Sequence, residues 1–392
     1  MTGPRDDRDL DLLLFGATGF TGGLTAEYLA GHGPDGLRWA LAGRNLEKLE
    51  RVRDRLGPDA AGLELIVVDA GDQAALEDVV RRARVVITTV GPYQQLGGPV
   101  VAACAETGTD YVDLTGEPEF VDRTYLDHHE TAVRTGARIV HACGFDSIPH
   151  DLGAYFTVKE LAPTGPVRMR GVVRASGTFS GGTFHSAMGA FSRAKQMSAT
   201  AKERRRVQGK PADGRTSKPV GAKPHHDKVL DRWLVPLPTI DPQIVVRSGA
   251  SLPVYGPDFR YSHFAGMKKL HNAAGAMLGV GAIGVAAQVP PLRDFLLRKV
   301  PQGSGPDEAK RERSWFTVDF VAETDERTLH TRVSGGDPGY TETAKMLAES
   351  ALCLAFDDNP PTAGCVTTAE AMGDRLLERL QMRGIRFEVV DD

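Results

Sequence analysis

The feature that most constrains the fold is a short apolar run that leads directly into a glycine-rich turn and then into a helical pattern. Residues 10–15 form the apolar run, Gly16-Ala17-Thr18-Gly19-Phe20-Thr21-Gly22 forms the turn, and residues 24–30 have helical periodicity. A strand, a glycine turn and a helix in this order form the first unit of a dinucleotide-binding fold. The three glycines permit, in order, a tight turn, close approach of a pyrophosphate, and close packing of helix and strand.

The turn is expected to bind the phosphates of a dinucleotide cofactor. The first N–H groups of the following helix point toward the turn, and the helix dipole places partial positive charge there. The spacing is GxxGxxG rather than GxGxxG, so the alternative is a turn that serves only the fold. The residues predicted to bind the cofactor here are Gly16, Thr18, Gly19, Phe20, Thr21 and Gly22.

The end of the second predicted strand indicates which nicotinamide cofactor is used. Residues 38–42 form this strand, which runs into Gly43-Arg44-Asn45. An acidic residue at this position binds the ribose 2′-hydroxyl of NAD, whereas an arginine pairs with the 2′-phosphate of NADP. Arg44 therefore predicts NADP, with Asn45 as a helix N-cap. The alternative is a surface arginine at the start of a helix.

Strand and helix patterns alternate through residues 1–160. Further strands are predicted at residues 63–68, 84–90, 111–114 and 138–141. This alternation predicts an α/β fold with a Rossmann-type, doubly wound parallel sheet and ligands at the carboxyl ends of its strands. Asp69, after the third strand, is expected near the adenine of NADP. Gly91 and Pro92, after the fourth strand, are expected near the nicotinamide.

Composition and charge exclude several classes of protein. Hydrophobic residues make up 41% of the 392 residues and charged residues 25%, which excludes a disordered or fibrous chain. The net charge of −4 argues against a nucleic-acid-binding protein. The four cysteines have no CxxC spacing, so we expect neither a metal site nor a disulfide framework, and we expect a cytoplasmic location. The first residues have no apolar segment of the kind found in secretory signals.

The pattern changes after about residue 160. Strands are predicted at residues 167–175, 244–246, 315–322 and 328–333. These are expected to form the sheet of a second α+β domain, residues 161–335, which faces the substrate or a lipid. Residues 336–392 are predicted to form helices and a strand that pack back on the first domain.

A basic segment interrupts the second domain. Residues 193–232 contain twelve Lys and Arg but four Asp and Glu. The segment has little periodicity and is interpreted as a solvated loop. The alternative is a docking surface for an acidic carrier protein or a phosphate-bearing substrate.

An uncharged apolar segment lies at residues 270–292, with Lys268 and Lys269 before it and Arg293 after it. Its length is marginal for a transmembrane helix, and it is rich in Gly and Ala. Three interpretations stay open: a helix that spans a membrane, an interfacial or lipid-facing helix, and a helix buried within the protein. A lipid-facing helix would suit peripheral contact with a membrane and a long-chain substrate.

Candidate catalytic residues follow from position. Tyr93 comes after the fourth strand, Asp146 comes after the sixth, and His185 lies in the glycine-rich loop at residues 176–186. Each of these side chains can hold a proton for transfer to substrate. Ser147 and His150 lie close to Asp146 in the chain. The alternative for Asp146 is a structural hydrogen-bond partner, and for His185 an ordinary bend in the chain.

Several motifs together resemble one known family. The chain resembles the saccharopine dehydrogenase-like oxidoreductases in GATGFTGG, AGR, VGPY, YVDLTGEPEF and ACGFDSIPHDLG, in that order. Near its end, Gly335-Gly336-Asp337-Pro338-Gly339-Tyr340, a predicted helix at residues 343–355, and Gly364-Cys365-Val366-Thr367-Thr368 resemble the actinobacterial branch of trans-acting enoyl reductases.

The resemblance implies an NADP-binding Rossmann domain joined to a second domain. In this branch, hydride passes from NADPH to the double bond of a polyketide- or lipid-derived acyl intermediate held on a partner polyketide synthase. Lysine metabolism is not implied, because the amino-acid-binding arginines of true saccharopine enzymes have no matching motif here. Two alternatives stay open: an NADP-linked reductase of C=N or C=O bonds, and a non-catalytic NADP-binding protein at a lipid surface.

Overall fold

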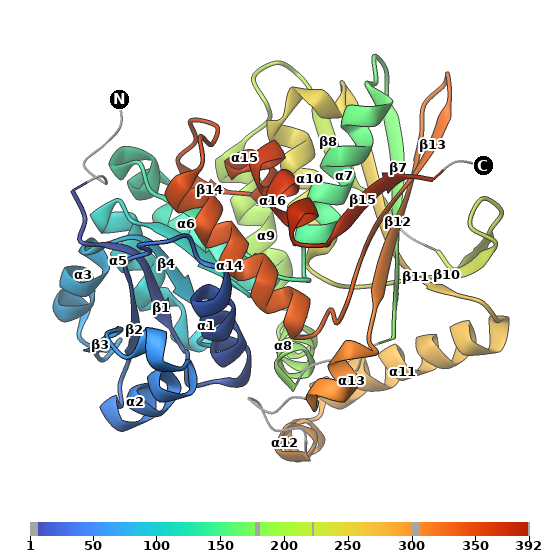
Figure 1. The fold of residues 1–392 in the computed structure, drawn as a ribbon. Helices are drawn as coiled ribbons and strands as arrows, with labels where there is room; N and C mark the ends of the chain where they lie inside the picture. The colour runs from blue at the N-terminus through green and yellow to red at the C-terminus, as the bar shows by residue number, and fades with distance from the viewer. Residues whose placement is uncertain (1–6, 177–180, 222, 300–305, 391–392) are drawn as a thin grey trace.

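The computed structural model contains two β-sheets with helices around them, and it describes residues 7–390 except 177–180, 222 and 300–305 (Figure 1). The first sheet has seven strands in the order β14-β6-β5-β4-β1-β2-β3, and every pair is parallel. Its strands are β1 Leu10–Phe15, β2 Trp39–Gly43, β3 Glu64–Val67, β4 Ala83–Thr88, β5 Asp110–Asp113, β6 Arg138–Val140 and β14 Gly364–Val366. All residues of β1 are buried, as expected where helices cover both faces of a parallel sheet. The predicted Rossmann-type sheet is thus confirmed.

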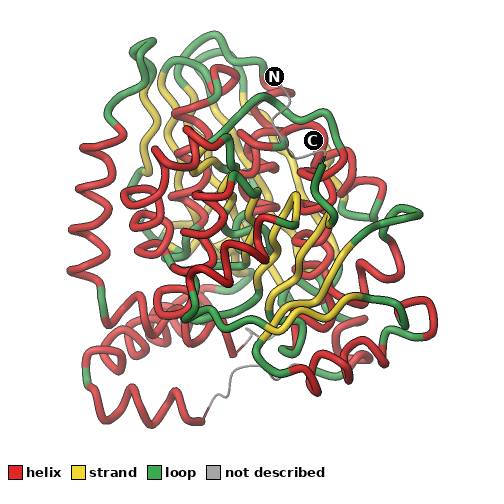
Figure 2. Tube along the Cα trace, turned by 90° about the vertical axis from the view of Figure 1, so that its left-hand side faces the viewer, coloured by secondary structure: helices red, strands yellow, loops and turns green. Residues whose placement is uncertain are grey.

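Helices connect the strands of the first sheet, and two of them begin at a side-chain cap. They are α1 Phe20–His32, α2 Leu46–Arg55, α3 Gln73–Arg81, α4 Tyr93–Leu96, α5 Gly98–Thr107 and α6 Pro118–Thr135. The side chain of Asn45 accepts a hydrogen bond from the Lys48 N–H and caps α2, as predicted. Asp72 caps α3 in the same way. Figure 2 shows the strands in the interior and the helices around them.

The second sheet is mixed and has eight strands, with β8 beside β11 and the others in the order β15-β13-β12-β7-β11-β10-β9. Its strands are β7 Val167–Ala175, β8 Thr216–Pro219, β9 His225–Asp227, β10 Arg232–Pro236, β11 Asp258–Met267, β12 Phe316–Glu323, β13 Thr328–Gly335 and β15 Arg386–Val389. Helix α7, Ile148–Leu161, covers one face of this sheet. A Cβ on Gly153 of α7 would lie 2.3 Å from the Phe320 ring on β12, so glycine permits this close packing. The predicted second α+β domain is confirmed.

The last part of the chain contributes to both sheets. Helix α14, Thr341–Phe356, packs beside α1 and against the first sheet, and β14 pairs with β6. Helices α15, Thr368–Ala371, and α16, Gly373–Met382, then lead to β15, which pairs with β13 in the second sheet. Residues 336–390 therefore join the two sheets and do not pack on the first alone.

Two sequence predictions for the second domain are wrong. The basic segment 193–232 is not a loop, because it contains α9, Ala194–Gln208, together with β8 and β9. Arg204 of α9 is buried and pairs with Asp122 of α6 at 2.7 Å, so part of the charge is internal. Residues 244–246 lie in α10, Asp241–Ser251, and not in a strand. A run of three apolar residues is compatible with a strand or with a helix. Pro242, in the first turn of α10, is typical of the start of a helix.

The remaining helices lie along the lower edge of the molecule in Figure 1. They are α8 Gly181–Ser192, α11 Leu270–Gln288, α12 Pro290–Lys299 and α13 Glu308–Glu312. Part of the predicted glycine-rich loop, residues 177–180, lies outside the described residues, and α8 begins earlier than expected. Within the described residues, α11 alone is long and apolar enough to cross a membrane by length and composition.

Candidate active site

The turn between β1 and α1 has a backbone that only glycine allows. Gly16 has a φ of +90°, and a Cβ there would lie 2.5 Å from Thr89 Oγ1. A Cβ on Gly22 would lie 2.1 Å from the Gly16 carbonyl oxygen, which is well inside van der Waals contact. The structure therefore gives two glycines of the motif the tight turn and the close packing predicted for them.

The turn leaves the start of α1 open to a ligand. Gly19 is the N-cap, and no side chain in the described residues caps the helix. Thr18 and Gly19 are exposed, while Phe20 and Thr21 are half-buried. The first N–H groups of α1 and its positive dipole end thus lie beside accessible space, which fits a pyrophosphate.

Arg44 and Asp69 lie at the same edge of the first sheet as the turn. Arg44 is exposed at the carboxyl end of β2, directly before the Asn45-capped α2, where a 2′-phosphate would be favoured. Asp69 follows β3 and is exposed, and its side chain accepts a hydrogen bond from the Gly71 N–H at 2.9 Å. Because β1, β2 and β3 are adjacent and parallel, both residues flank the position expected for the adenosine half of NADP.

Gly91 and Pro92 follow β4 and are half-buried. The Thr89 N–H, just before them, donates to the Phe15 carbonyl at 3.1 Å and so joins the carboxyl ends of β4 and β1. This junction, where the chain crosses from one side of the sheet to the other, is the usual ligand position in doubly wound sheets. Gly91 and Pro92 therefore lie at this junction, and their contact with a nicotinamide stays a prediction.

Tyr93 is buried, and its hydroxyl is engaged by the backbone. It donates to the Thr88 carbonyl at 3.1 Å and accepts from the Leu114 N–H at 3.2 Å. Burial and the nearby Asp113 carboxylate raise the pKa of Tyr93 well above its usual value. The hydroxyl thereby holds the ends of β4 and β5 together. Its role as a proton donor stays a prediction.

Asp146 lies at the carboxyl end of the sheet, in the loop between β6 and α7. Its side chain is half-buried and faces the segment after β5, where a Cβ on Gly116 would lie 3.2 Å from its Oδ2. The next residue, Ser147, has a φ of 107°, a strained value for a residue other than glycine. This turn therefore fixes the Asp146 carboxyl beside the ends of β5 and β6.

A buried cluster that the sequence analysis did not find lies behind Asp146. His150 Nδ1 lies 3.2 Å from Asp241 Oδ1, and His263 Nε2 lies 3.4 Å from Asp241 Oδ2. The hydroxyl of Tyr261 lies 3.1 Å from His263 Nδ1. The ligand atoms of the two histidines and Asp241 lie within 4.8 Å of one another. Two imidazoles and a carboxylate could also hold a divalent metal ion, which the cysteine spacing did not predict.

The cluster sets the ionisation of the site. Burial lowers the pKa of His150 to about 4, so this imidazole is neutral at pH 7. Burial raises the pKa of Asp241, but the two imidazoles and the Thr239 hydroxyl outweigh it, and the net pKa lies below its usual value. Burial, followed by the charge of Asp241, raises the pKa of Asp146 to about 7. Asp146 can therefore hold a proton near neutral pH.

The start of α14 completes the site from the end of the chain. The ring of Tyr340 packs edge-on against Phe20 of the glycine turn, with centroids 4.9 Å apart. The Thr343 hydroxyl accepts a hydrogen bond from the Phe145 N–H at 3.1 Å, next to Asp146. On α13, the Arg311 guanidinium lies 5.5 Å from the centroid of the Phe20 ring. The motif at residues 335–340, near the end of the chain, thus contacts the glycine turn near its beginning.

His185, the third catalytic candidate, lies on α8. It is half-buried, and its ring is 6.3 Å from that of Phe184. Helix α8 packs against α11 in the group of helices at the lower edge of the molecule (Figure 1). The role of His185 as a proton donor stays a prediction.

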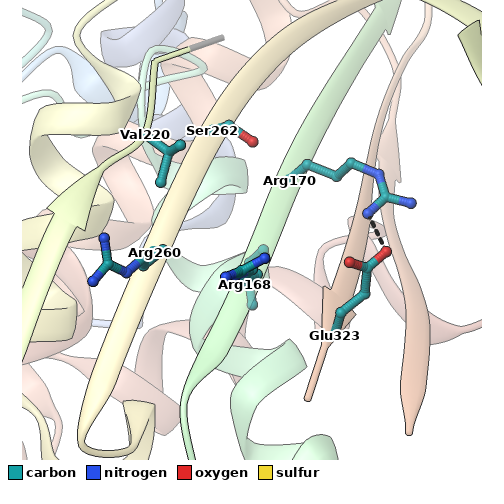
Figure 3. A pocket seen from close by; sticks show the side chains of 7 residues that line it. Arg168, Arg170, Val220, Arg260, Ser262 and Glu323 are labelled. Atoms are coloured by element: carbon teal, nitrogen blue, oxygen red, sulfur yellow. Dashed lines mark hydrogen bonds and ion pairs between the residues drawn. The ribbon is translucent and has the colours of Figure 1, made fainter. Parts of the chain in front are cut away.

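A separate pocket of about 430 Å³ lies on the second sheet (Figure 3). Its lining includes Arg168 and Arg170 from β7, Arg260 and Ser262 from β11, and Glu323 from β12. Arg170 pairs with Glu323 at 2.6 Å and Arg260 with Asp258 at 2.9 Å, so much of its positive charge is balanced. No residue of the glycine turn or of the buried cluster lines it, and we do not place the active site there.

Two residues missed by the sequence analysis position the loops of the site. The Glu117 carboxylate, buried at the start of α6, accepts hydrogen bonds from the N–H groups of Tyr93 and Gln94 at 3.0 and 2.9 Å. Asp241 was missed because it begins α10, a helix within which a strand was predicted at residues 244–246. The alternation of Phe259, Tyr261 and His263 was the available signal that a strand directs His263 inward.

Comparison with known proteins agrees with this geometry. The family model of the saccharopine dehydrogenase NADP binding domain matches residues 12–140, which contain the glycine turn and Arg44. A Mycobacterium tuberculosis protein named provisionally as a trans-acting enoyl reductase is 38% identical, over 97% of each chain. Trans-acting enoyl reductases of Mycobacterium tuberculosis and Mycobacterium ulcerans are 36% identical over 97% and 96% of this chain, and over 97% of their own chains.

The structural comparison concerns the fold. A saccharopine dehydrogenase (L-Glu forming) from Saccharomyces cerevisiae superposes with a TM-score of 0.54, over 97% of this chain and all of that one. The identity is 15%, so the likeness shows a shared two-domain architecture and not a shared substrate.

Proposed function

The chain belongs to the trans-acting enoyl reductases of the saccharopine dehydrogenase-like family, and from this premise we propose that it reduces the C=C bond of an enoyl group on an acyl intermediate, with NADPH as reductant. The observation that carries the mechanism is the position of Asp146. This carboxyl lies at the carboxyl edge of the cofactor-binding sheet, and burial raises its pKa to about 7, so that it can hold a proton near neutral pH.

The residues that would hold the cofactor fit its chemistry. The uncapped start of α1 and the glycine turn suit the pyrophosphate, and Arg44 suits the 2′-phosphate. When bound, NADPH supplies a hydride for one carbon of the double bond. Phe20 is the first residue of α1, and the contacts of its ring with Tyr340 and Arg311 hold the start of this helix in place.

The protein supplies the proton for the other carbon. Asp146 holds this proton because burial and the Asp241 charge oppose its ionisation. Asp241 stays ionised through its contacts with His150, His263 and Thr239. We therefore assign Asp146 as the general acid and Asp241 as a positioning residue behind it.

The substrate and its carrier are part of the proposal. A reductase that acts in trans needs an acyl group presented by another protein, and we propose that the carrier belongs to a polyketide synthase. Support comes from the names of relatives that match nearly the full chain. The cytoplasmic location stays a prediction.

The test is a product analysis with purified protein, NADPH and an enoyl thioester. We expect the saturated thioester, with one hydrogen from NADPH and one from solvent, so that the reaction in D2O places one deuterium in the product. Mass spectrometry distinguishes this from unreacted substrate. Asp146→Asn should bind NADPH normally and form little product.

Two other outcomes would replace the proposal. Reduction of C=N or C=O substrates, with no turnover of enoyl thioesters, would assign another NADP-linked reductase on the same fold. NADPH binding without oxidation in the presence of any of these substrates would favour the non-catalytic alternative.

A further inference from the structure

Helices α11 and α12 carry an apolar surface that the proposed reaction does not use. Leu278 and Val285 of α11 are 77% and 67% exposed. Other large apolar side chains that are exposed on these two helices, or on the residue between them, are Leu270, Met277, Val289, Leu292 and Phe295. Soluble proteins rarely expose so many apolar side chains together without a partner.

The outer face of α11 has the same character as its inner face. Ala273, Ala286 and Ala287 are buried against the rest of the protein. A surface helix of a soluble protein would place charged or polar residues opposite this buried stripe. Here the opposite face holds Leu278 and Val285, so the helix has an apolar environment on one side and needs one on the other.

The apolar surface has a basic border at both ends. Residues 268–299 contain five Lys and Arg but a single acidic residue, Asp294. Lys268 and Lys269 precede α11, and Arg298 and Lys299 end α12. Apolar side chains bordered by lysine and arginine match a lipid surface with anionic headgroups.

The surface adjoins the proposed active site. The Gln288 side chain on α11 donates a hydrogen bond to the Phe191 carbonyl on α8. Helix α13, which follows α12 in the chain, places Arg311 over Phe20 of the cofactor turn. Figure 1 shows α8, α11, α12 and α13 along one edge of the molecule.

We propose that α11 and α12 dock this protein on an anionic lipid surface, with α11 lying in the plane of the headgroups. The helix does not span the bilayer, because its inner face is buried against its own protein. A second copy of the chain fits less well than a lipid surface. A two-fold interface would bring basic ends against basic ends in either orientation of α11.

The docking goes beyond the reductase function and is independent of it. Each exposed leucine or valine that enters the interface adds hydrophobic free energy, and each nearby lysine or arginine adds attraction to anionic headgroups. Binding therefore needs both the apolar face and the negative lipid charge. Neither requires NADPH or substrate, so vesicle binding and catalysis can fail separately.

The experiment is flotation of the full-length protein with vesicles of phosphatidylcholine, with or without phosphatidylglycerol. The wild type should float with the anionic vesicles, bind neutral vesicles weakly, and detach as salt is raised. Leu278→Glu and Val285→Glu should each reduce binding about tenfold or more, because an apolar side chain that would enter the lipid surface is replaced by a charge. Both residues are exposed, so the variants should keep their fold and their melting temperature.

Met382→Glu is the matched control. Met382 is also 77% exposed but lies at the end of α16, and its substitution should leave flotation unchanged. Equal flotation of the wild type and the two α11 variants would overturn the proposal. So would a wild-type dimer in sedimentation experiments that Leu278→Glu converts to monomer without any vesicle binding, because the surface would then be a subunit interface.

Discussion

The cofactor turn and the proton-holding cluster are built in opposite ways. Residues 16–22 are contiguous, and their function depends on backbone geometry and on space that only glycine leaves. The cluster of Asp146, His150, Asp241 and His263 combines the β6–α7 region, the start of α10 and the middle of β11. The first site is a local motif, whereas the second exists only after the two sheets have packed.

The two kinds of chemistry are therefore encoded differently in the chain. Phosphate binding needs N–H groups and room, which a single strand–turn–helix provides. A carboxyl that keeps its proton at neutral pH needs burial and a neighbouring charge, which require distant segments. Substitutions can therefore break the cofactor turn and the proton-holding cluster separately.

Gly22→Ala should abolish measurable NADPH binding. The added Cβ would lie 2.1 Å from the Gly16 carbonyl oxygen, so the turn has to move. Gly31→Ala is the control, because it lies in the same helix with nothing within 4 Å of the added Cβ. The control should bind normally and melt at the same or a higher temperature. Normal binding by Gly22→Ala would show that the turn is not the phosphate site.

Asp146→Asn should lower kcat for enoyl reduction roughly 10²- to 10⁴-fold, the usual contribution of a general acid. The Kd for NADPH should stay the same, because the phosphate-binding turn is untouched. Stopped-flow measurement of NADPH oxidation gives the rate, and cofactor fluorescence gives the Kd. If kcat is unchanged, the proton comes from another group, and His185 becomes the next candidate.

Arg44→Ala should weaken NADPH binding roughly 10- to 100-fold, since a charge-assisted hydrogen bond contributes about 1.5–3 kcal/mol. NADH lacks the 2′-phosphate, so its affinity should not change. Fluorescence titration with both cofactors measures this selectivity. An equal loss for NADPH and NADH would mean that Arg44 acts on the fold and not on the phosphate.

Asp241→Asn should shift the pH profile of the reduction rate to lower pH. Its effect on the rate at pH 7 should be smaller than that of the three substitutions above. The acid form of Asp146 is required, so the rate falls as pH rises through its pKa of about 7. Removing the Asp241 charge lowers that pKa, and the fall then begins at lower pH. A shift of one unit would reduce the rate at pH 8 about tenfold and leave the rate at low pH unchanged. A uniform loss at every pH would indicate structural damage instead.

Much of the first sheet could be predicted from sequence because each of its units is local. The predicted strand at residues 10–15 matches β1, and the predicted N-cap at Asn45, which begins α2, is confirmed. The second sheet was harder to predict because its strands pair with partners that are distant in the chain. Examples are the pairs β7 with β11 and β13 with β15. A short apolar run such as residues 244–246 does not distinguish a strand from a helix, and these residues lie in α10.

The sequence by itself determined the α/β class, the glycine turn and the preference for NADP, because these depend on residues close together in the chain. Tertiary structure alone decided that Asp241 lies behind Asp146 and that the Tyr93 hydroxyl is held by backbone. It also decided that α11 is exposed, since composition reports how apolar a helix is but not what covers it. The physical reason is that burial and pKa depend on neighbours brought together by packing, which are distant in the sequence.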